Sequence, residues 1–259
     1  MNLPAAHSLA TSESALSRVK RFWEEHVNNE YYTRADRGSE AYFREIETRR
    51  YRWHYHLVEL FRKLQGSSGR LLDVGCGIGI DSIQLDRCGF DVVAIDLTES
   101  AIEVARRFAR ARSVDIDFRV GDAERLEFTD GSFDAVHSFG VLHHTPRIEQ
   151  AIAEIHRVLK PGGTAYLMLY HRRSLVGWIH RLLSLPYESP RHLKDHCPVA
   201  DSFTVQEVHR LLREFSQVQV SLEYPFTYGF RYFTFWIPRP LQRLLGRWVG
   251  WHLMIQATR

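Results

Sequence analysis

The chain has 259 residues, of which 44% are hydrophobic and 25% are charged. This balance is typical of an ordinary globular protein and excludes extended disorder, and the length allows one large domain with additions or two small ones. The net charge of +3 is too small to indicate a nucleic acid or an anionic membrane as partner by itself.

The cysteines and the first residues point to the compartment. Cys76, Cys88 and Cys197 show neither C-x-x-C spacing nor a Cys/His ligand pattern, which favours reduced thiols over a disulfide framework or a zinc site. The N-terminus lacks a charged start followed by an apolar run, and no stretch approaches the roughly 20 apolar residues of a membrane span. We therefore expect a cytoplasmic protein without a transmembrane helix or a bound metal.

Two helices are predicted at the start of the chain. Apolar residues recur at helical spacing over 14–30 and over 39–64, with charged residues between them. The stretch "QGSSGR" at 65–70 breaks this pattern and reads as a linker.

From Leu71 onward, short β-rich runs alternate with amphipathic helices. The runs "LLDVG", "DVVAIDL", "IDFRVGD", "FDAVHSF" and "GTAYLMLY" are each followed by polar or helical segments, and "QVQVSLEY" and "WHLMIQA" come later. Such alternation predicts an α/β fold, a doubly wound and mostly parallel seven-stranded sheet. Capping boxes are expected at Ser100/Glu103 and at Thr204/Glu207.

The turn after the first predicted strand is rich in glycine. It reads D-x-G-x-G-x-G from Asp73 to Gly79, and glycines this dense indicate a sharp bend or a closely approaching ligand. The dinucleotide fingerprint G-x-G-x-x-G fails in both registers, because Ile80 and Ser82 stand where the third glycine is needed. The loop that binds nucleoside triphosphates, G-x-x-x-x-G-K-[ST], is absent as well.

An acidic residue, Asp96, ends the second predicted strand, 96 − 75 = 21 positions after the first glycine of the turn. A carboxylate placed there accepts hydrogen bonds from both hydroxyls of a ribose, and Asp73 lies near enough to help hold a cationic amine. With "VGDAERLEF" and "RVLKPGG" following in order, the stretch from Leu71 to Tyr170 resembles class I methyltransferases that use S-adenosylmethionine, within their small-molecule group.

The resemblance implies the fold named above, which is Rossmann-like, and S-adenosylmethionine as the cofactor. The glycine loop would pass the methionine and ribose, Asp96 would bind the ribose, and Asp122 and Ala123 would bracket the adenine. The full set of cofactor contacts that it implies is Asp73, Gly75, Cys76, Gly77, Gly79, Asp96, Leu97, Asp122, Ala123 and Ser138. Asp122 read alone equally starts a turn, and Cys76 reads as a residue buried beside the loop rather than a catalytic thiol.

The sulfonium activates its own methyl group, so the protein mainly aligns an acceptor, and a general base is needed only for a protonated oxygen or an acidic carbon. Candidates for the base follow the fourth and fifth strands: His143, His144, Tyr170 and His171. Histidines after the fourth strand also serve as pocket walls or helix caps in this family. Our hypothesis names His144 or His171 as the base.

The resemblance also divides the chain. Family members fold N-terminal helices over the cofactor, so we expect a helical lid at 1–66 and a methyltransferase domain at 67–259 with insertions at 171–203 and 224–251. Acceptor contacts are expected at Tyr31, Tyr32, Tyr42, His144 and Tyr228. The alternative for such aromatic stripes is plain core.

The insertion at 224–251 is dense in aromatic residues and arginines. It predicts either a cap over an apolar or aromatic acceptor, or an element that contacts a membrane peripherally. Prolines break the long helix that membrane adsorption prefers, which favours the cap.

Two other functions compete with methylation of a small apolar or aromatic metabolite. The stretch "RRYRWHYH" at 49–56 interleaves basic and aromatic residues, as in a nucleic-acid methyltransferase, but also fits a helix with solvated arginines and buried rings. The base-clamping Asn/Asp-Pro-Pro-aromatic signature and a Pro-Cys nucleophile are both absent, so no nucleic-acid partner is expected. A non-catalytic cofactor-binding module is the third alternative.

Overall fold

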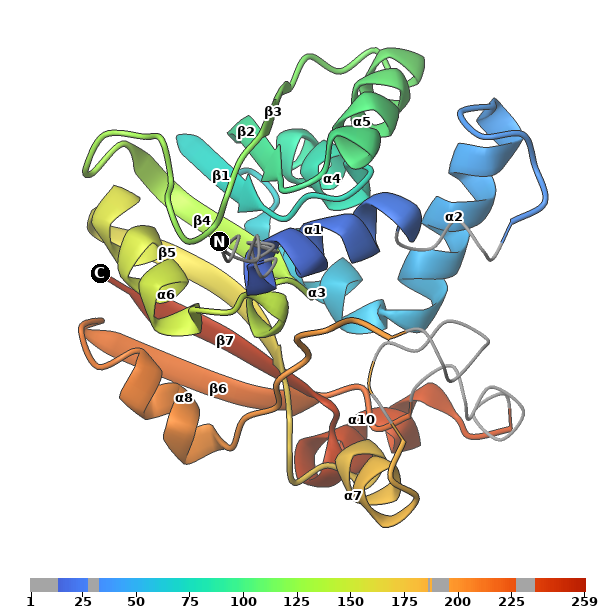
Figure 1. Cartoon of the computed structure of the whole chain (residues 1–259), viewed down its shortest axis with the longest axis vertical. Helices are drawn as coiled ribbons and strands as arrows, with labels where there is room; N and C mark the ends of the chain where they lie inside the picture. The colour runs from blue at the N-terminus through green and yellow to red at the C-terminus, as the bar shows by residue number, and fades with distance from the viewer. Residues whose placement is uncertain (1–13, 28–32, 186, 188–195, 227–235) are drawn as a thin grey trace, which may run out of the picture.

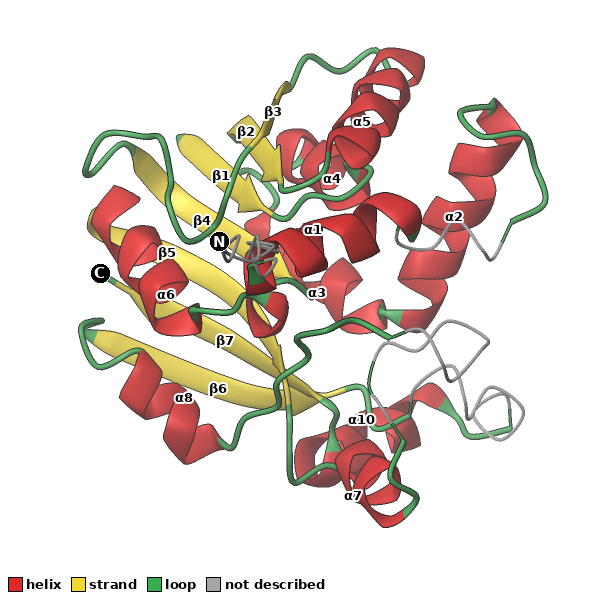
Figure 2. Ribbon diagram, viewed as in Figure 1, coloured by secondary structure: helices red, strands yellow, loops and turns green. Residues whose placement is uncertain are grey.

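The computed structural model describes residues 14–27, 33–185, 187, 196–226 and 236–259 (Figure 1). The predicted contacts Tyr31, Tyr32 and Tyr228 lie outside these residues. A seven-stranded sheet in the order β3-β2-β1-β4-β5-β7-β6 forms the centre, and helices cover both of its faces (Figure 2).

The first five strands in the chain are parallel, as predicted. They are β1 (Arg70–Val74), β2 (Asp91–Asp96), β3 (Asp117–Val120), β4 (Phe133–Phe139) and β5 (Leu159–Tyr170). The last two, β6 (Gln217–Glu223) and β7 (His252–Thr258), pair antiparallel with each other, and β7 pairs antiparallel with β5. The order changes direction beside β1, and open α/β sheets bind ligands at such a point.

Two hydrophobic cores lie on opposite faces of the sheet. Alternate residues of a strand point to opposite faces, and accordingly Leu71 belongs to one core and Leu72 to the other. The first core also takes residues from α4 (Ile80–Arg87) and α5 (Glu99–Ala111), whereas the second takes residues from α6 (Ile148–Val158) and α8 (Val205–Leu211). Burial on both faces explains why the central strands read as continuous apolar runs.

The N-terminal part contains three described helices, not the two expected from sequence. These are α1 (Ala15–Glu25), α2 (Glu40–Trp53) and α3 (Tyr55–Leu64). The predicted helix over 39–64 is interrupted at His54, whose φ of −95° and ψ of 57° leave the helical region. Its Nδ1 hydrogen-bonds the Arg50 carbonyl, and the ring is buried against Phe139 and His252. These contacts of the buried His54 ring hold the chain in the bend between α2 and α3.

Only one of the two predicted capping boxes forms. Thr204 and Glu207 cap α8 reciprocally. The Ser100/Glu103 prediction is wrong, because α5 begins two residues earlier, after the N-cap residue Thr98. The Glu24 carboxylate of α1 accepts hydrogen bonds from the Glu99 and Ser100 amides instead, at 2.8 and 3.2 Å, so the cap of α5 comes from a distant helix.

The C-terminal insertion contains α10 (Arg239–Val249). Pro238 is its N-cap residue, and Pro240 lies in its first turn. Proline is favoured there, because the first amides of a helix have no partner within it. The prolines therefore begin this helix and do not break it, which removes the argument by which the sequence favoured a cap over a membrane contact.

Candidate functional site

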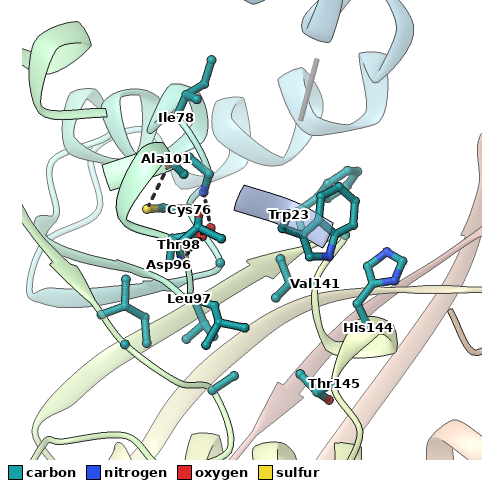
Figure 3. Close-up of a pocket in the computed structure, with 18 of the residues that line it drawn as sticks. Trp23, Cys76, Ile78, Asp96, Leu97, Thr98, Ala101, Val141, His144 and Thr145 are labelled. Carbon is teal, nitrogen blue, oxygen red and sulfur yellow. Dashed lines mark hydrogen bonds between the residues drawn. The ribbon is translucent and has the colours of Figure 1, made fainter. Parts of the chain in front are cut away.

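A pocket opens at the carboxyl ends of β1, β2 and β4. The glycine turn and the residues after β2 and β3 line one part of it, and residues of α1 and the segment after β4 line the rest. Figure 3 shows Trp23, Val141 and His144 on one side and Cys76, Asp96 and Leu97 on the other.

The glycine turn has a shape that only glycine adopts without strain. Gly75, Gly77 and Gly79 have φ of 75°, 54° and 79°, the left-handed region that disfavours a side chain. A Cβ at Gly75 would lie 2.2 Å from Val141, whereas a Cβ at Gly77 would meet nothing within 4 Å. The turn thus packs tightly against the segment that follows β4 on one side and leaves open space above Gly77.

Asp96 faces the pocket at the end of β2. One of its carboxylate oxygens accepts a hydrogen bond from the Gly77 amide at 2.9 Å, and the other accepts from the Thr98 amide and hydroxyl. Burial raises the pKa of Asp96, while these hydrogen bonds oppose the rise. The carboxylate is therefore tied to the glycine turn and oriented before any ligand arrives.

Asp122 and Ala123 both line the pocket after β3. The Asp122 carboxylate also accepts a hydrogen bond from the Glu124 amide at 2.8 Å, so Asp122 both starts a turn and lines the pocket. Glu124 in turn is 3% exposed and pairs with the Arg147 guanidinium at 2.8 Å, which fastens this loop to the start of α6.

Three of the predicted cofactor residues do not line the pocket. The Asp73 carboxylate is 2% exposed and accepts from the Ser82 hydroxyl at 2.6 Å and the His137 ring at 2.8 Å, so it braces the sheet beneath the turn and does not face an amine. Ser138 is buried and donates to the Val74 carbonyl. Gly79 begins α4, and Phe118 occupies the space where its side chain would be. The other seven line it: Gly75, Cys76, Gly77, Asp96, Leu97, Asp122 and Ala123.

The Cys76 side chain is no nucleophile in this setting. Burial raises the pKa of its thiol well above the usual value, and the nearby Asp96 and Asp73 carboxylates add to the rise. A protonated thiol behaves as a small apolar side chain, so Cys76 contributes apolar surface to the pocket wall.

An ion pair that the sequence did not reveal stands at the pocket. Arg50 of α2 and Asp81 of α4 both line it, and the guanidinium donates to both oxygens of the carboxylate. The Tyr51 hydroxyl also donates to Asp81 at 3.0 Å. Burial is the largest single influence and would raise the pKa of Asp81, but the Arg50 charge and the hydrogen bonds from Arg50 and Tyr51 together lower it. The two residues are 31 positions apart, so no local motif joins them.

The helix α1 and the segment just after it supply an apolar wall: Leu16, Val19 and Trp23 lie on the helix, and Val27 follows it. These positions follow i, i+3, i+7 and i+11, a single helical stripe, and this spacing is the signal that could have found them. Trp23 meets the His144 ring edge-on, with centroids 5.2 Å apart. Part of the predicted lid segment therefore contacts the pocket, through residues other than the predicted tyrosines.

Of the four base candidates, only His144 lines the pocket. Its Nδ1 lies 2.7 Å from the Val199 carbonyl, an oxygen that only accepts. Nδ1 therefore carries the proton, and Nε2 carries the lone pair of the neutral ring.

The other three candidates are packed away from the pocket lining. His143 is fully buried, stacks on Tyr170 at 3.7 Å, and has its pKa lowered well below the usual value by burial and by neighbouring His144. Tyr170 packs against Trp251. His171 lies 3.0 Å from the Gly250 carbonyl, and burial lowers its pKa. None of these three residues lines the pocket, which favours His144 over His171 as the candidate base.

Tyr42 and the basic-aromatic stretch at 49–56 also turn out to be structural. Tyr42 is 1% exposed in the core between α2 and the sheet, so it does not contact an acceptor. In the stretch, Arg50 pairs with Asp81, while Tyr55 and His56 are buried. The buried rings of the predicted helix are thus confirmed at Tyr55 and His56, but Arg50 is not solvated, since it pairs with the buried Asp81.

Residues 72–167 match a family described as a methyltransferase domain. A ubiquinone biosynthesis O-methyltransferase from Xanthomonas oryzae is 37% identical over 148 residues, which are 54% of this chain and 61% of the relative. The homologous enzyme from Nitrosococcus oceani is 38% identical over 104 residues, 40% of this chain and 44% of the relative. The chain thus spans less than two thirds of the length of these relatives.

Among solved structures, a SAM-dependent methyltransferase from Thermotoga maritima superposes with a TM-score of 0.59 at 21% identity, covering 93% of this chain and 99% of that one. This likeness establishes the fold. No helix of the described residues is both long and apolar enough to cross a membrane.

Proposed function

Because the chain carries a class I S-adenosylmethionine-dependent methyltransferase domain, we propose that it transfers the methyl group to an oxygen of a small, apolar or aromatic acceptor. The observation that carries this proposal is one pocket whose lining brings the cofactor-type residues Gly77 and Asp96 together with the apolar ring of Trp23 and the imidazole of His144. The O-methyltransferase names of the relatives support the choice of oxygen.

The residues present fit S-adenosylmethionine. The open space above Gly77 admits a ligand against the backbone, and the oriented Asp96 carboxylate suits the two ribose hydroxyls. Asp122 and Ala123 stand where adenine would be bracketed. Arg50 and Asp81 would meet the charged amino-acid end, since one offers N–H donors and the other carboxylate oxygens.

When bound, the cofactor supplies a methyl group already activated by its sulfonium. The chain then has to exclude water and align the acceptor. Val19 and Trp23 of α1, with Val27 just after the helix, cover the pocket with apolar surface, and the exclusion of water strengthens every polar contact within. His144 Nε2 takes the proton of an acceptor hydroxyl, while the Val199 carbonyl holds the opposite nitrogen and stabilises the charged ring.

The neighbouring side chains favour an apolar or aromatic acceptor. Trp23 and Val141 contact His144, and Phe139 lines the same pocket; aromatic rings pack on such walls edge-on or offset. A phosphorylated or highly charged acceptor would find Arg50 already neutralised by Asp81.

The test is transfer of labelled methyl to a panel of phenols of rising apolar size, with an oligoribonucleotide beside them, across the pH range 6 to 9. We expect transfer to phenols, and a rate that falls at low pH for the unaltered protein. His144→Gln should lower kcat by about 10²-fold and flatten this pH profile, whereas His171→Gln, the matched control, should retain both. Unchanged kcat and profile in His144→Gln would refute the base, and transfer only to RNA would refute the acceptor class.

A further inference from the structure

Exposed apolar side chains are concentrated in one region of the molecule. Among the described residues, the large apolar side chains left exposed lie on α7 (Leu175–Leu182), on α10 and on residues flanking these helices, with only Val58 and Val120 elsewhere. We call the set Trp178, Leu182, Leu241, Leu244 and Trp248 the α7–α10 surface. Trp248 is 76% exposed and Leu182 is 82% exposed, far beyond the scattered apolar exposure of ordinary surfaces.

The residues of this surface form stripes. Leu241, Leu244 and Trp248 follow i, i+3 and i+7 on α10, and Trp178 and Leu182 follow i and i+4 on α7, so each set shares one face of its helix. On the opposite side of α10, Gly246 packs against residues 223–225 at the end of β6. The apolar stripes are thus the outward faces of two anchored helices.

Both helices stand at the same end of the sheet. α7 follows the last residues of β5, α10 precedes the first residues of β7, and Tyr170 of β5 pairs with His252 of β7. The His180 ring of α7 stacks 6.4 Å from Trp251, which follows α10. Figure 1 shows the two helices together at this end of the molecule.

The charged side chains of helices α7 and α10 are all basic. α7 and α10 contain Arg181, Arg239, Arg243 and Arg247 but no acidic residue. Arg243 pairs with Glu59 and Arg181 lies over the Trp178 ring, 4.8 Å from its centroid. Arg181, Arg239 and Arg247 form no ion pair with another described residue, although the Glu223 carboxylate at the end of β6 is close enough to interact electrostatically with Arg243 and Arg247.

We propose that the α7–α10 surface docks the protein peripherally on an anionic lipid bilayer. Tryptophan and arginine are the side chains that favour the boundary between headgroups and acyl chains, where a ring is half buried and a guanidinium meets phosphate. A second copy of this chain is a poorer occupant, because a two-fold contact would oppose arginines to arginines with no acidic residue in the surface to pair them.

The position of the surface connects it to the pocket. The pocket lies at the carboxyl ends of β1, β2 and β4, and α7 leaves the carboxyl end of the parallel strand β5, so both lie at the same edge of the sheet. A bilayer at this surface would hold an apolar acceptor near the site. The docking itself does not depend on methyl transfer.

Flotation of the full chain with vesicles tests the proposal without any assay of activity. We expect binding to phosphatidylcholine vesicles that contain phosphatidylglycerol, weaker binding at high salt, and little binding to phosphatidylcholine alone. Leu244→Ser/Trp248→Ser should lower the partition coefficient at least about tenfold, and Arg239→Ser/Arg247→Ser should lower it at low salt.

The matched control is Val120→Ser, which removes an apolar side chain of β3 that is 47% exposed and should leave binding unchanged. Unaltered cofactor affinity in each variant shows that the domain has kept its fold. Absence of binding to either vesicle would overturn the proposal, as would equal binding by Leu244→Ser/Trp248→Ser. A dimer in sedimentation that this double variant dissociates, without vesicle binding, would assign the surface to a second copy instead.

Discussion

Two glycines of the same turn have opposite surroundings, and substitution should separate packing from binding. At Gly75, an added Cβ lies 2.2 Å from Val141 at a φ of 75°. Gly75→Ala should therefore lower the free energy of unfolding by about 2–4 kcal/mol, from overpacking and backbone strain together. Urea unfolding measures this, and Gly75→Ala/Val141→Ala should recover part of the loss. No recovery in the double variant would show that the clash is not the cause.

At Gly77, nothing lies within 4 Å of an added Cβ, although φ is 54°. Gly77→Ala should cost only the backbone strain, about 1–2 kcal/mol. It should nevertheless weaken S-adenosylmethionine binding at least about tenfold in calorimetry, since the methyl would fill the space proposed for the ligand. Unchanged affinity would place the cofactor elsewhere.

Helix α1 is attached to the rest of the domain through Glu24, whose carboxylate caps the start of helix α5. Glu24 accepts from the amides of Glu99 and Ser100 at the start of α5; burial would raise the pKa of Glu24, but these hydrogen bonds lower it. Glu24→Ala should cost about 1 kcal/mol of stability and should weaken cofactor binding, because α1 carries Trp23 in the pocket wall. Glu25→Ala, an exposed neighbour on the same helix, is the control. Equal affinities in the two variants would contradict the docking role of the cap.

A second connection between elements joins α2 to α4 through Arg50 and Asp81. The Asp81 side chain is 5% exposed, so removal of its partner leaves a buried charge. Arg50→Leu should lower the free energy of unfolding by about 3–5 kcal/mol, and Arg50→Leu/Asp81→Asn should lose clearly less. Thermal or urea unfolding compares the two. Additive losses would mean that the pair is not coupled.

For the whole molecule, buried histidines should make stability depend on pH. Burial lowers the pKa of His54 to about 3 and lowers those of His56 and His252 well below the usual value; the His252 and His56 rings lie in hydrogen-bond contact at 3.1 Å. These rings bind protons mainly on unfolding. Their contribution is complete above about pH 6.5 and is lost as the pH falls toward the folded-state pKa values, by up to about 1.4 kcal/mol per pH unit for each histidine.

Urea unfolding at about pH 7.5 and pH 5 measures this loss. His252→Gln should reduce the pH dependence, whereas the exposed His209→Gln on α8 should not change it. A flat profile between the two pH values would mean that the cluster is hydrated and titrates freely.

Sequence reasoning succeeded where one stretch of chain carries its own signal. The glycine turn, Asp96 and Asp122 follow successive strands, and parallel strands bring their carboxyl ends to one edge. It failed where a contact joins distant segments. The Arg50–Asp81 pair, the Glu24 cap and the bend at His54 each depend on a partner far along the chain. At Asp73 the motif position is clear, but Ser82 and His137 hydrogen-bond its oxygens and it does not line the pocket, which no local pattern indicates.

The central claim is methyl transfer to a small acceptor, and the most direct measurement follows labelled methyl from S-adenosylmethionine into a host extract. Small-molecule, lipid, RNA and protein fractions are separated, with Asp96→Ala as the blank. If the protein methylates a small acceptor, we expect label in the small-molecule or lipid fraction with the unaltered protein and none with the blank. Label in RNA or protein, or binding of the cofactor without transfer to any fraction, would contradict it.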